Sequence, residues 1–168
     1  KLWKNLGSYR IRRSININLQ QKSHSFLNGF FYLISSMTAK VIYEGNLRTV
    51  CTHMASGATI ITDAPTDNHG RGEAFSPTDT VATALASCML TVMGIKAQQM
   101  GLDMNGTSCE VTKVMYAEPR RIGEIHINMT FPANGYSNKD KVILENTART
   151  CPVFYSLHPD LKKEISLR

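Results

Sequence analysis

Residues 75–101 read FSPTDTVATALASCMLTVMGIKAQQMG, and this stretch decides the fold. Ser76 is a favourable N-cap, Pro77 suits the first helical position, and Asp79 stands where the acid of a capping box belongs. Gly101 supplies a C-terminal stop. The pattern predicts one helix of about 24 residues, about 36 Å long.

The composition of this helix predicts how it is packed. No charged residue occurs from Thr80 to Ile95, and apolar side chains fall on every face. A helix that is apolar all round must be covered all round, and one small antiparallel sheet covers only one side. We therefore expect a second copy of the chain to cover the other side, in an obligate dimer. A monomer whose own strands wrap the helix is the alternative.

Short segments of alternating polarity on both sides of the helix predict strands. The expected strands are 39–44, 47–54 and 58–63 before the helix, and 109–117, 124–131 and 161–168 after it, with a loop at 119–123. In the most regular of these, Ile125, Ile127, Met129 and Phe131 are directed inward. A second capped helix is expected from Ser137 to about Thr150, and a short one from Pro152 to Leu157. This order defines an α+β fold.

The net charge of +6 is concentrated in residues 1–36, which contain basic residues and no acid. From Met37 onward basic and acidic residues balance, so we exclude a nucleic-acid groove on the folded part. We interpret residues 1–36 as a leader outside the fold, non-native or disordered, from upstream translation or cloning. An organellar transit segment and a secretory signal are the alternatives. Residues 37–168 then form a single domain, and we expect no membrane span.

Two of the four cysteines lie in helical settings that suit thiol chemistry. Cys151 directly precedes Pro152 at the expected start of a helix, and a helix N-terminus favours a thiolate. Cys88 lies within the apolar helix, where burial raises the pKa of a thiol. The residues alone therefore predict that Cys151 is the more acidic thiol and that Cys88 is inert unless an arginine reaches it. A packing role for Cys88 is the alternative.

The remaining polar residues give weaker signals. No Cys-x-x-Cys and no histidine pair at ligand spacing occurs, so a metal site is not expected. Cys51 and Cys109 fit packing positions on strands. His126 lies on a polar strand face, where we expect a cross-strand contact rather than catalysis.

Two segments taken together resemble the signature segments of the OsmC/Ohr family, which comprises osmotically induced proteins and organic hydroperoxide resistance proteins. They are Phe75-Ser76-Pro77-Thr78-Asp79-Thr80, with Cys88 eleven residues after Pro77, and Thr150-Cys151-Pro152-Val153. Tyr43-Glu44-Gly45 and Thr62-Asp63-Ala64-Pro65 fit the branch with a Phe-Ser-Pro-Thr-Asp box. The resemblance covers residues 38–168.

This resemblance implies an intertwined homodimer, in which long buried central helices are backed by curved antiparallel sheets and the active sites lie at the dimer interface. It also implies a thiol peroxidase that reduces organic hydroperoxides without metal or other cofactor. Cys88 would become a sulfenic acid, and Cys151 would condense with it to a disulfide. A dithiol such as a lipoylated protein would reopen that bond. Arg48 would hold Cys88 as the thiolate.

The chain departs from the family pattern at one position. In the hydroperoxide resistance branch a glutamate that pairs with the arginine follows the box proline, but here that position is Thr78. Asp79 comes one residue later, where it could be fully occupied as the helix cap. Glu73 is the other acid near the box, and we treat it as a second possible partner for Arg48.

These observations favour a cytoplasmic, dimeric peroxidase whose methionine-rich lining suits an alkyl tail. The methionines that suggest such a lining are Met89, Met93, Met100 and Met115. A non-catalytic stress-response protein that binds a small apolar ligand at the dimer interface is one alternative. A cysteine hydrolase is another, with Cys151 as nucleophile and His158 or His126 as base.

Overall fold

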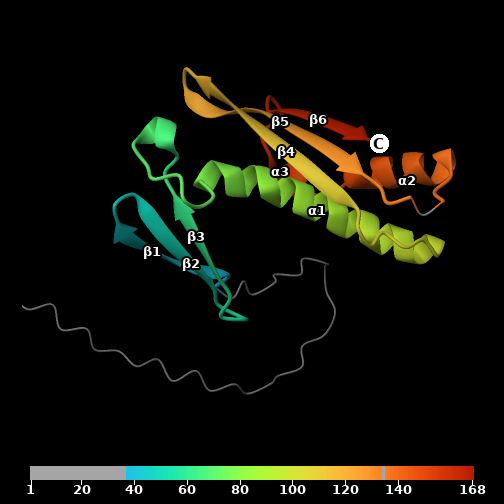
Figure 1. Ribbon diagram of the computed structural model, residues 1–168, viewed down its shortest axis with the longest axis horizontal. Coiled ribbons are helices and arrows are strands. Elements are labelled where there is room, and N and C mark those ends of the chain that lie inside the picture. Colours follow the sequence, from blue (N-terminus) through green and yellow to red (C-terminus); the bar gives the residue numbers. More distant parts are fainter. Residues whose placement is uncertain (1–36, 134) are drawn as a thin grey trace, which may run out of the picture. The chain divides into compact units, whose positions relative to one another are not determined.

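The computed structural model describes residues 37–133 and 135–168, so the predicted leader 1–36 lies outside the described residues. Ten elements follow one another in the described part of the chain (Figure 1). They are β1 (Ala39–Gly45), β2 (Arg48–His53), β3 (Thr59–Asp63), the 3-10 helix η1 (Thr66–Asn68), α1 (Pro77–Met100), β4 (Ser108–Ala117), β5 (Arg120–Thr130), α2 (Asn138–Ala148), α3 (Pro152–Ser156) and β6 (Lys162–Leu167). The α+β order expected from the sequence is confirmed.

The strands form two three-stranded sheets. β1, β2 and β3 make one antiparallel sheet in chain order. In the other, β4 pairs antiparallel with β5, and β6 lies parallel to the far edge of β5. Figure 1 shows α1 running along this second sheet, with α2 and α3 also packed near α1.

The prediction of a loop at 119–123 was wrong, because β5 already begins at Arg120 and the hairpin loop is therefore shorter than expected. Gly123 is buried at a β-bulge of β5, because Val114 pairs with Glu124 and Met115 with Ile122, which leaves Gly123 out of the pairing. A Cβ atom there would meet the ring of Tyr116 at 2.3 Å, so the packing of this ring requires a glycine. The inward residue before the bulge is Ile122, which packs against the core, so the strict alternation of inward residues breaks at Gly123.

The ends of α1 are confirmed to the residue. The Ser76 hydroxyl accepts from the Asp79 N–H, and the Asp79 carboxylate accepts from the Ser76 N–H, so both halves of the capping box are present. At the other end Gly101 adopts a left-handed conformation with φ 69°. Its N–H closes the last turn on the carbonyl groups of Ala97 and Gln98.

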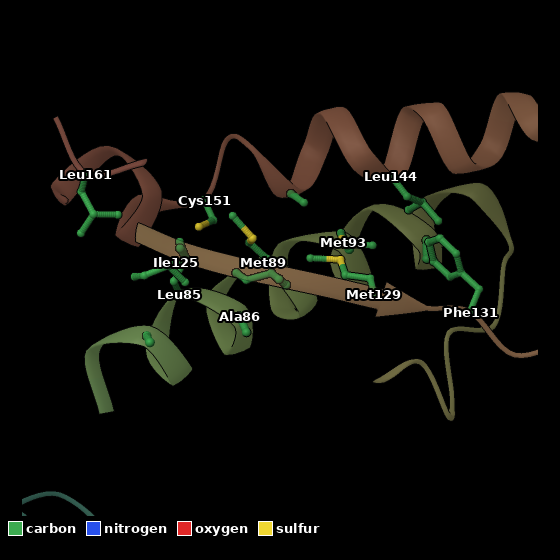
Figure 2. Packing of buried hydrophobic residues seen from close by; sticks show 14 residues of the cluster. Leu85, Ala86, Met89, Met93, Ile125, Met129, Phe131, Leu144, Cys151 and Leu161 are labelled. Atoms are coloured by element: carbon green, nitrogen blue, oxygen red, sulfur yellow. The ribbon is translucent and has the colours of Figure 1, made fainter. Parts of the chain in front are cut away.

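One side of α1 forms the core with the second sheet and α2 (Figure 2). The buried side chains of α1 are Ala82, Leu85, Ala86, Met89, Met93 and Ala97. They pack in one cluster with the inward side chains of β5 and with Leu144 and Ala148 of α2. Ile125, Ile127, Met129 and Phe131 are all buried there, as the alternation predicted.

The opposite side of α1 is open in a single copy of the chain. Thr83, Ala84, Ser87 and Thr91 are exposed, and so is Ile95. The described residues therefore do not wrap the helix as the monomer alternative required. By length and composition α1 could also cross a membrane, with mean hydropathy 1.5 and 33% of its most apolar window buried. Core helices of soluble proteins meet the same criterion, so this is a weak indication.

The β1–β3 sheet also carries exposed apolar side chains, and it does so on both faces. The register places Val41, Cys51 and Ile60 on one face and Ile42, Val50 and Ile61 on the other. Val41, Ile42, Ile60 and Ile61 are each about half exposed or more. A sheet needs cover on its apolar faces, and contiguous exposed apolar surface is typical of an interaction site.

Candidate functional site

The structure brings Cys88 and Cys151 together within one chain. Cys88 lies in the middle of α1, half-buried, and packs against the core cluster that contains Cys151. Cys151 is the N-cap of α3, 0% exposed, and its side chain points into the cluster (Figure 2). Its Sγ accepts a hydrogen bond from the Phe154 N–H at 3.3 Å. Two thiols from distant segments thus share one end of the core.

The electrostatic setting of Cys151 corrects the prediction from the sequence. Burial raises the pKa of the Cys151 thiol, and the neighbouring side chain of Cys88 raises this pKa further. The Phe154 N–H lowers it, but by less than burial raises it. The expectation that the start of α3 makes the Cys151 thiol acidic is therefore not met, because burial in the core outweighs the N–H groups of Phe154 and Val153. A protonated Cys151 suits a resolving thiol better than a nucleophile.

Arg48, at the start of β2, is held by two carboxylates. Its Nε donates to Asp63 Oδ1 at 2.7 Å and its Nη2 donates to Asp63 Oδ2 at 2.8 Å, which is the bidentate arrangement of an arginine and a carboxylate. Nη2 also donates to Glu73 Oε2 at 2.8 Å. The pairing with Glu73 that the sequence suggested is present. Asp63 and Glu73 both raise the pKa of the guanidinium, which stays charged.

Asp63 is the residue that sequence reasoning missed. Arg48 and Asp63 are directly opposite each other in the antiparallel pair of β2 and β3, so their side chains lie on the same face. The signal was the short connection of residues 54–58, which makes β2 and β3 a hairpin and so places the end of β3 opposite the start of β2. Hydrogen bonding to Arg48 holds the pKa of the Asp63 carboxyl below its usual range.

Asp79 does not serve Arg48 in this structure. Its carboxylate closes the capping box with Ser76 and lies 2.7 Å from Lys113 Nζ. Lys113 also donates to the hydroxyl of Thr78 at 2.8 Å. Although desolvation opposes it, the contacts with Lys113 and Ser76 together lower the pKa of Asp79. Lys113 was also missed; its inward position between Val111 and Met115 on β4 was the signal, since an inward lysine needs a partner.

Arg48 and Cys88 are not brought together within one copy. In the described residues the polar partners of the Arg48 side chain are Asp63 and Glu73. The groups that shift the pKa of Cys151, which neighbours Cys88, include Phe154, Val153 and Cys88 and not Arg48. The two halves of the predicted site therefore lie on separate parts of the chain.

The prediction that methionines line the substrate pocket was wrong in part. Met89 and Met93 are fully buried in the core cluster and line no open space. Met115 does line a cleft of about 350 Å³ near the start of α1. Leu47, Pro65 and Pro77 share this lining with the polar side chains of Thr49 and Thr78. A small ligand fits such a cleft.

The two other cysteines lie at packing positions. Cys51 is half-buried on β2, with its Sγ 4.0 Å from the hydroxyl of Thr49. Cys109 at the start of β4 is half-buried beside α1, and burial raises its pKa. In the part of the chain that the structure describes, the contact of Cys51 is the Thr49 hydroxyl, and burial alone raises the pKa of Cys109, so neither thiol has a cationic partner. We assign both to packing.

One cluster has the residue types of a metal site. Ligand atoms of Glu124, His126 and Glu164 lie within 4.8 Å of one another. However, the Lys162 ammonium lies 3.2 Å from Glu124 and 2.6 Å from Glu164, and so pairs with both carboxylates. The contact of His126 with Glu164 at 3.6 Å is the cross-strand contact expected for His126. We assign the cluster to a surface ion-pair network.

The fold and the site define a class of protein. It is an α+β protein with a long capped helix whose cysteine meets a second, buried cysteine at the start of a short helix. The sequence model for OsmC-like protein matches residues 70–166. The chain belongs to the OsmC-like family, as the resemblance predicted.

Solved structures agree with this membership. A protein from Psychrobacter arcticus 273-4, with the provisional name osmotic stress induced and detoxification response protein, is 53% identical, with TM-score 0.78 over 82% of this chain and 100% of that chain. An organic hydroperoxide resistance protein OsmC from Legionella pneumophila shares the fold at 16% identity, with TM-score 0.61 over 80% of this chain and 97% of that chain. The organic hydroperoxide resistance protein OhrB of Bacillus subtilis does so at 15% identity, with TM-score 0.57 over 79% and 98%. No protein with a curated description matches the sequence.

Proposed function

We propose that this protein is a thiol-dependent peroxidase that reduces organic hydroperoxides through Cys88 and Cys151. The observation that carries the proposal is the meeting of these two thiols, one in the middle of α1 and one at the start of α3. Family membership supports it, since relatives of the same fold are named for organic hydroperoxide resistance.

The first step is oxidation of Cys88. Its thiolate attacks one peroxide oxygen, the O–O bond breaks, and the alkoxide leaves and takes up a proton to become an alcohol. Cys88 then carries a sulfenic acid. The sulfur has lost two electrons and the peroxide has gained them.

The second step closes the disulfide. The Cys151 sulfur attacks the Cys88 sulfur, the S–O bond breaks, and hydroxide leaves as water with the thiol proton. The raised pKa of Cys151 keeps this thiol protonated until the sulfenic acid forms beside it. A dithiol reductant, such as a lipoylated protein, then returns two electrons by thiol–disulfide exchange. This cycle needs a compartment that keeps dithiols reduced, and we propose the cytoplasm.

The cation for the first step comes from a second copy of the chain in this proposal. Arg48 lies on the face of the β1–β3 sheet that also carries Ile42, Val50 and Ile61. This exposed apolar face and the open, uncharged side of α1 both need cover. A homodimer in which each covers the other would bring Arg48 of one copy toward Cys88 of its partner. The resulting positive charge would favour the Cys88 thiolate.

The test uses peroxide and thiol mapping. Cys151→Ser protein treated with cumene hydroperoxide should accumulate a sulfenic acid on Cys88, which dimedone traps and mass spectrometry locates. Cys88→Ser protein should consume no peroxide, while Cys109→Ser serves as the matched control and should behave like the wild type. If excess peroxide leaves Cys88 of the Cys151→Ser protein unmodified, the peroxidase proposal fails.

The same reactions separate the alternatives. A protein that only binds a small apolar ligand would leave all thiols reduced, and the cleft beside Leu47 and Met115 is where such a ligand would fit. A hydrolase would form an acyl adduct on Cys151 with an activated ester. The complete burial of Cys151 argues against that reaction, and the exposed imidazole of His158 pairs with Asp160 instead.

A further inference from the structure

One terminal nitrogen of the Arg48 guanidinium, Nη1, makes no hydrogen bond among the described residues. Of the five N–H groups of a guanidinium, three are used, by Nε and Nη2 toward Asp63 and Glu73. Among the described residues, none accepts from Nη1. The fork with Asp63 fixes the plane of the guanidinium, so Nη1 points away from that carboxylate. Nη1 therefore retains donors for an anion while both partners stay bound, and the Arg48 side chain is 25% exposed.

The two carboxylates on Arg48 are unequal. Asp63 is 1% exposed, lies on β3, and makes two hydrogen bonds to Arg48 along one edge of the guanidinium. Its backbone is tied as well, because the Asp63 N–H donates to the Phe75 carbonyl at 3.1 Å. Glu73 is 60% exposed and makes one hydrogen bond from a loop. Asp63 is thus a buried partner with two hydrogen bonds to Arg48, and Glu73 is an exposed partner with one.

We propose that Asp63 is the positioning residue of the peroxide site, which holds Arg48 so that Nη1 faces the anion formed at Cys88. This inference rests on the proposed function. It accounts for the departure at Thr78, because the acid that orients the arginine stands on β3 instead of after the box proline. Asp79 is unavailable for that task, since Lys113 and the helix cap occupy its carboxylate.

Asp63 can act on Cys88 in two ways, through its own negative charge or by fixing the position of the Arg48 guanidinium, and the two predict opposite effects. If Asp63 acted only through its charge, its removal would make the site more positive, stabilise the Cys88 thiolate and speed its reactions. If Asp63 fixes the guanidinium, its removal frees Arg48 to turn toward Glu73 and slows them. Glu73→Gln removes the same charge from the same guanidinium while the Asp63 fork remains. The two carboxylate-to-amide changes therefore have opposite expected signs.

The experiment measures the second-order rate of Cys88 oxidation by cumene hydroperoxide. Asp63→Asn should lower this rate about 10- to 100-fold, as expected for loss of fixed geometry at a reacting centre. Glu73→Gln should raise it by about two- to threefold, the size typical of an exposed ion pair. Glu145→Gln, which breaks a comparable pair with Arg149 on α2, is the control and should leave the rate unchanged.

A second readout requires no peroxidase activity. The pH dependence of Cys88 alkylation by iodoacetamide should move to higher pH in Asp63→Asn and to lower pH in Glu73→Gln. In an Arg48→Lys background, which cannot form the fork, Asp63→Asn should have no additional effect on either measurement. Far-UV circular dichroism of each variant checks that it is folded, and Asp63→Glu provides a charged variant with altered reach if Asp63→Asn is not.

The outcomes distinguish the two proposals. If the wild type forms no sulfenic acid, the proposed function fails, while alkylation still reports whether Asp63 acts on Cys88 through Arg48. If the wild type is oxidised but Asp63→Asn and Glu73→Gln shift both measurements in the same direction, Asp63 acts by charge and the positioning proposal is wrong. An equal effect of Asp63→Asn in the Arg48→Lys background would also overturn it.

Discussion

The β1–β3 sheet and the part of the chain from α1 to β6 differ in how completely one copy buries their apolar side chains. From α1 onward, one copy closes a core in which helices and strands bury each other's apolar side chains. The β1–β3 sheet instead exposes apolar side chains on both faces. The thiols belong to the closed part and the cation to the open sheet, and in the proposed mechanism a second copy of the chain joins them.

The largest expected effect contrasts the cores of these two regions. Ile127→Ala removes a fully buried side chain from the closed core and should lower the free energy of unfolding by about 2–5 kcal/mol. Ile61→Ala alters the half-exposed sheet and should cost about 1 kcal/mol or less in a single copy. Urea unfolding at several protein concentrations measures both, and the cost of Ile61→Ala should depend on concentration if a second copy covers that face. A cost that is equal at all concentrations would contradict cover by a second copy.

The next effect tests whether the cation acts across copies. Arg48→Ala should slow Cys88 oxidation about 100-fold, comparable to loss of one charge-stabilising donor in an active site. Coexpression of Arg48→Ala with Cys88→Ser chains should restore about a quarter of the wild-type sites, since mixed dimers contain one complete pair. Stopped-flow peroxide consumption measures the recovery. No recovery in verified mixed dimers would show that each copy uses its own Arg48.

A smaller effect concerns the junction of the two regions, where the N-cap of α1 meets Lys113. Ser76→Ala removes a buried cap and should cost about 1 kcal/mol in the free energy of unfolding. Ser137→Ala, which removes the equivalent cap of α2 on the surface, is the matched comparison and should cost no more. Thermal unfolding of both variants decides this, and a larger loss for Ser137 would contradict the packing of the α1 start.

The smallest effect is a change in pH dependence. Because Arg48 lowers the pKa of Asp63 in the folded state, this pair contributes stability above the unfolded pKa of about 4. That contribution is lost as the pH falls through the lower folded pKa. The stability of Asp63→Asn should therefore decline less steeply than that of the wild type on acidification. Identical slopes in urea unfolding from pH 6 to pH 2 would show that the pair contributes nothing.

The sequence predicted the parts of the fold that local rules determine. Ser76, Pro77, Asp79 and Gly101 set the ends of α1 through hydrogen bonds to nearby backbone, so its limits were correct. The alternation in β5 predicted its buried face. The start of β5 was missed because a β-bulge at Gly123 breaks the alternation between Ile122 and Ile125.

The site was harder to predict, because its contacts join distant segments. Cys88 and Cys151 were identified from their helical settings and Arg48 by motif resemblance, and the roles of all three stay predictions. The effect of the helix start on Cys151 was overestimated, because burial by the core outweighs the N–H groups of Phe154 and Val153 at the start of a five-residue helix. Asp63 and Lys113 were missed because their importance depends on strand register and on which partner a charge meets.

The proposed redox pair of Cys88 and Cys151 within one chain can be detected by disulfide mapping. Reduced protein receives one equivalent of cumene hydroperoxide, and non-reducing peptide mapping then locates every disulfide. We expect an intrachain Cys88–Cys151 bond, formed with one molecule of cumyl alcohol for each bond. Loss of thiols at Cys51 or Cys109, with Cys88 and Cys151 still reduced, would show that these two residues are not the redox pair.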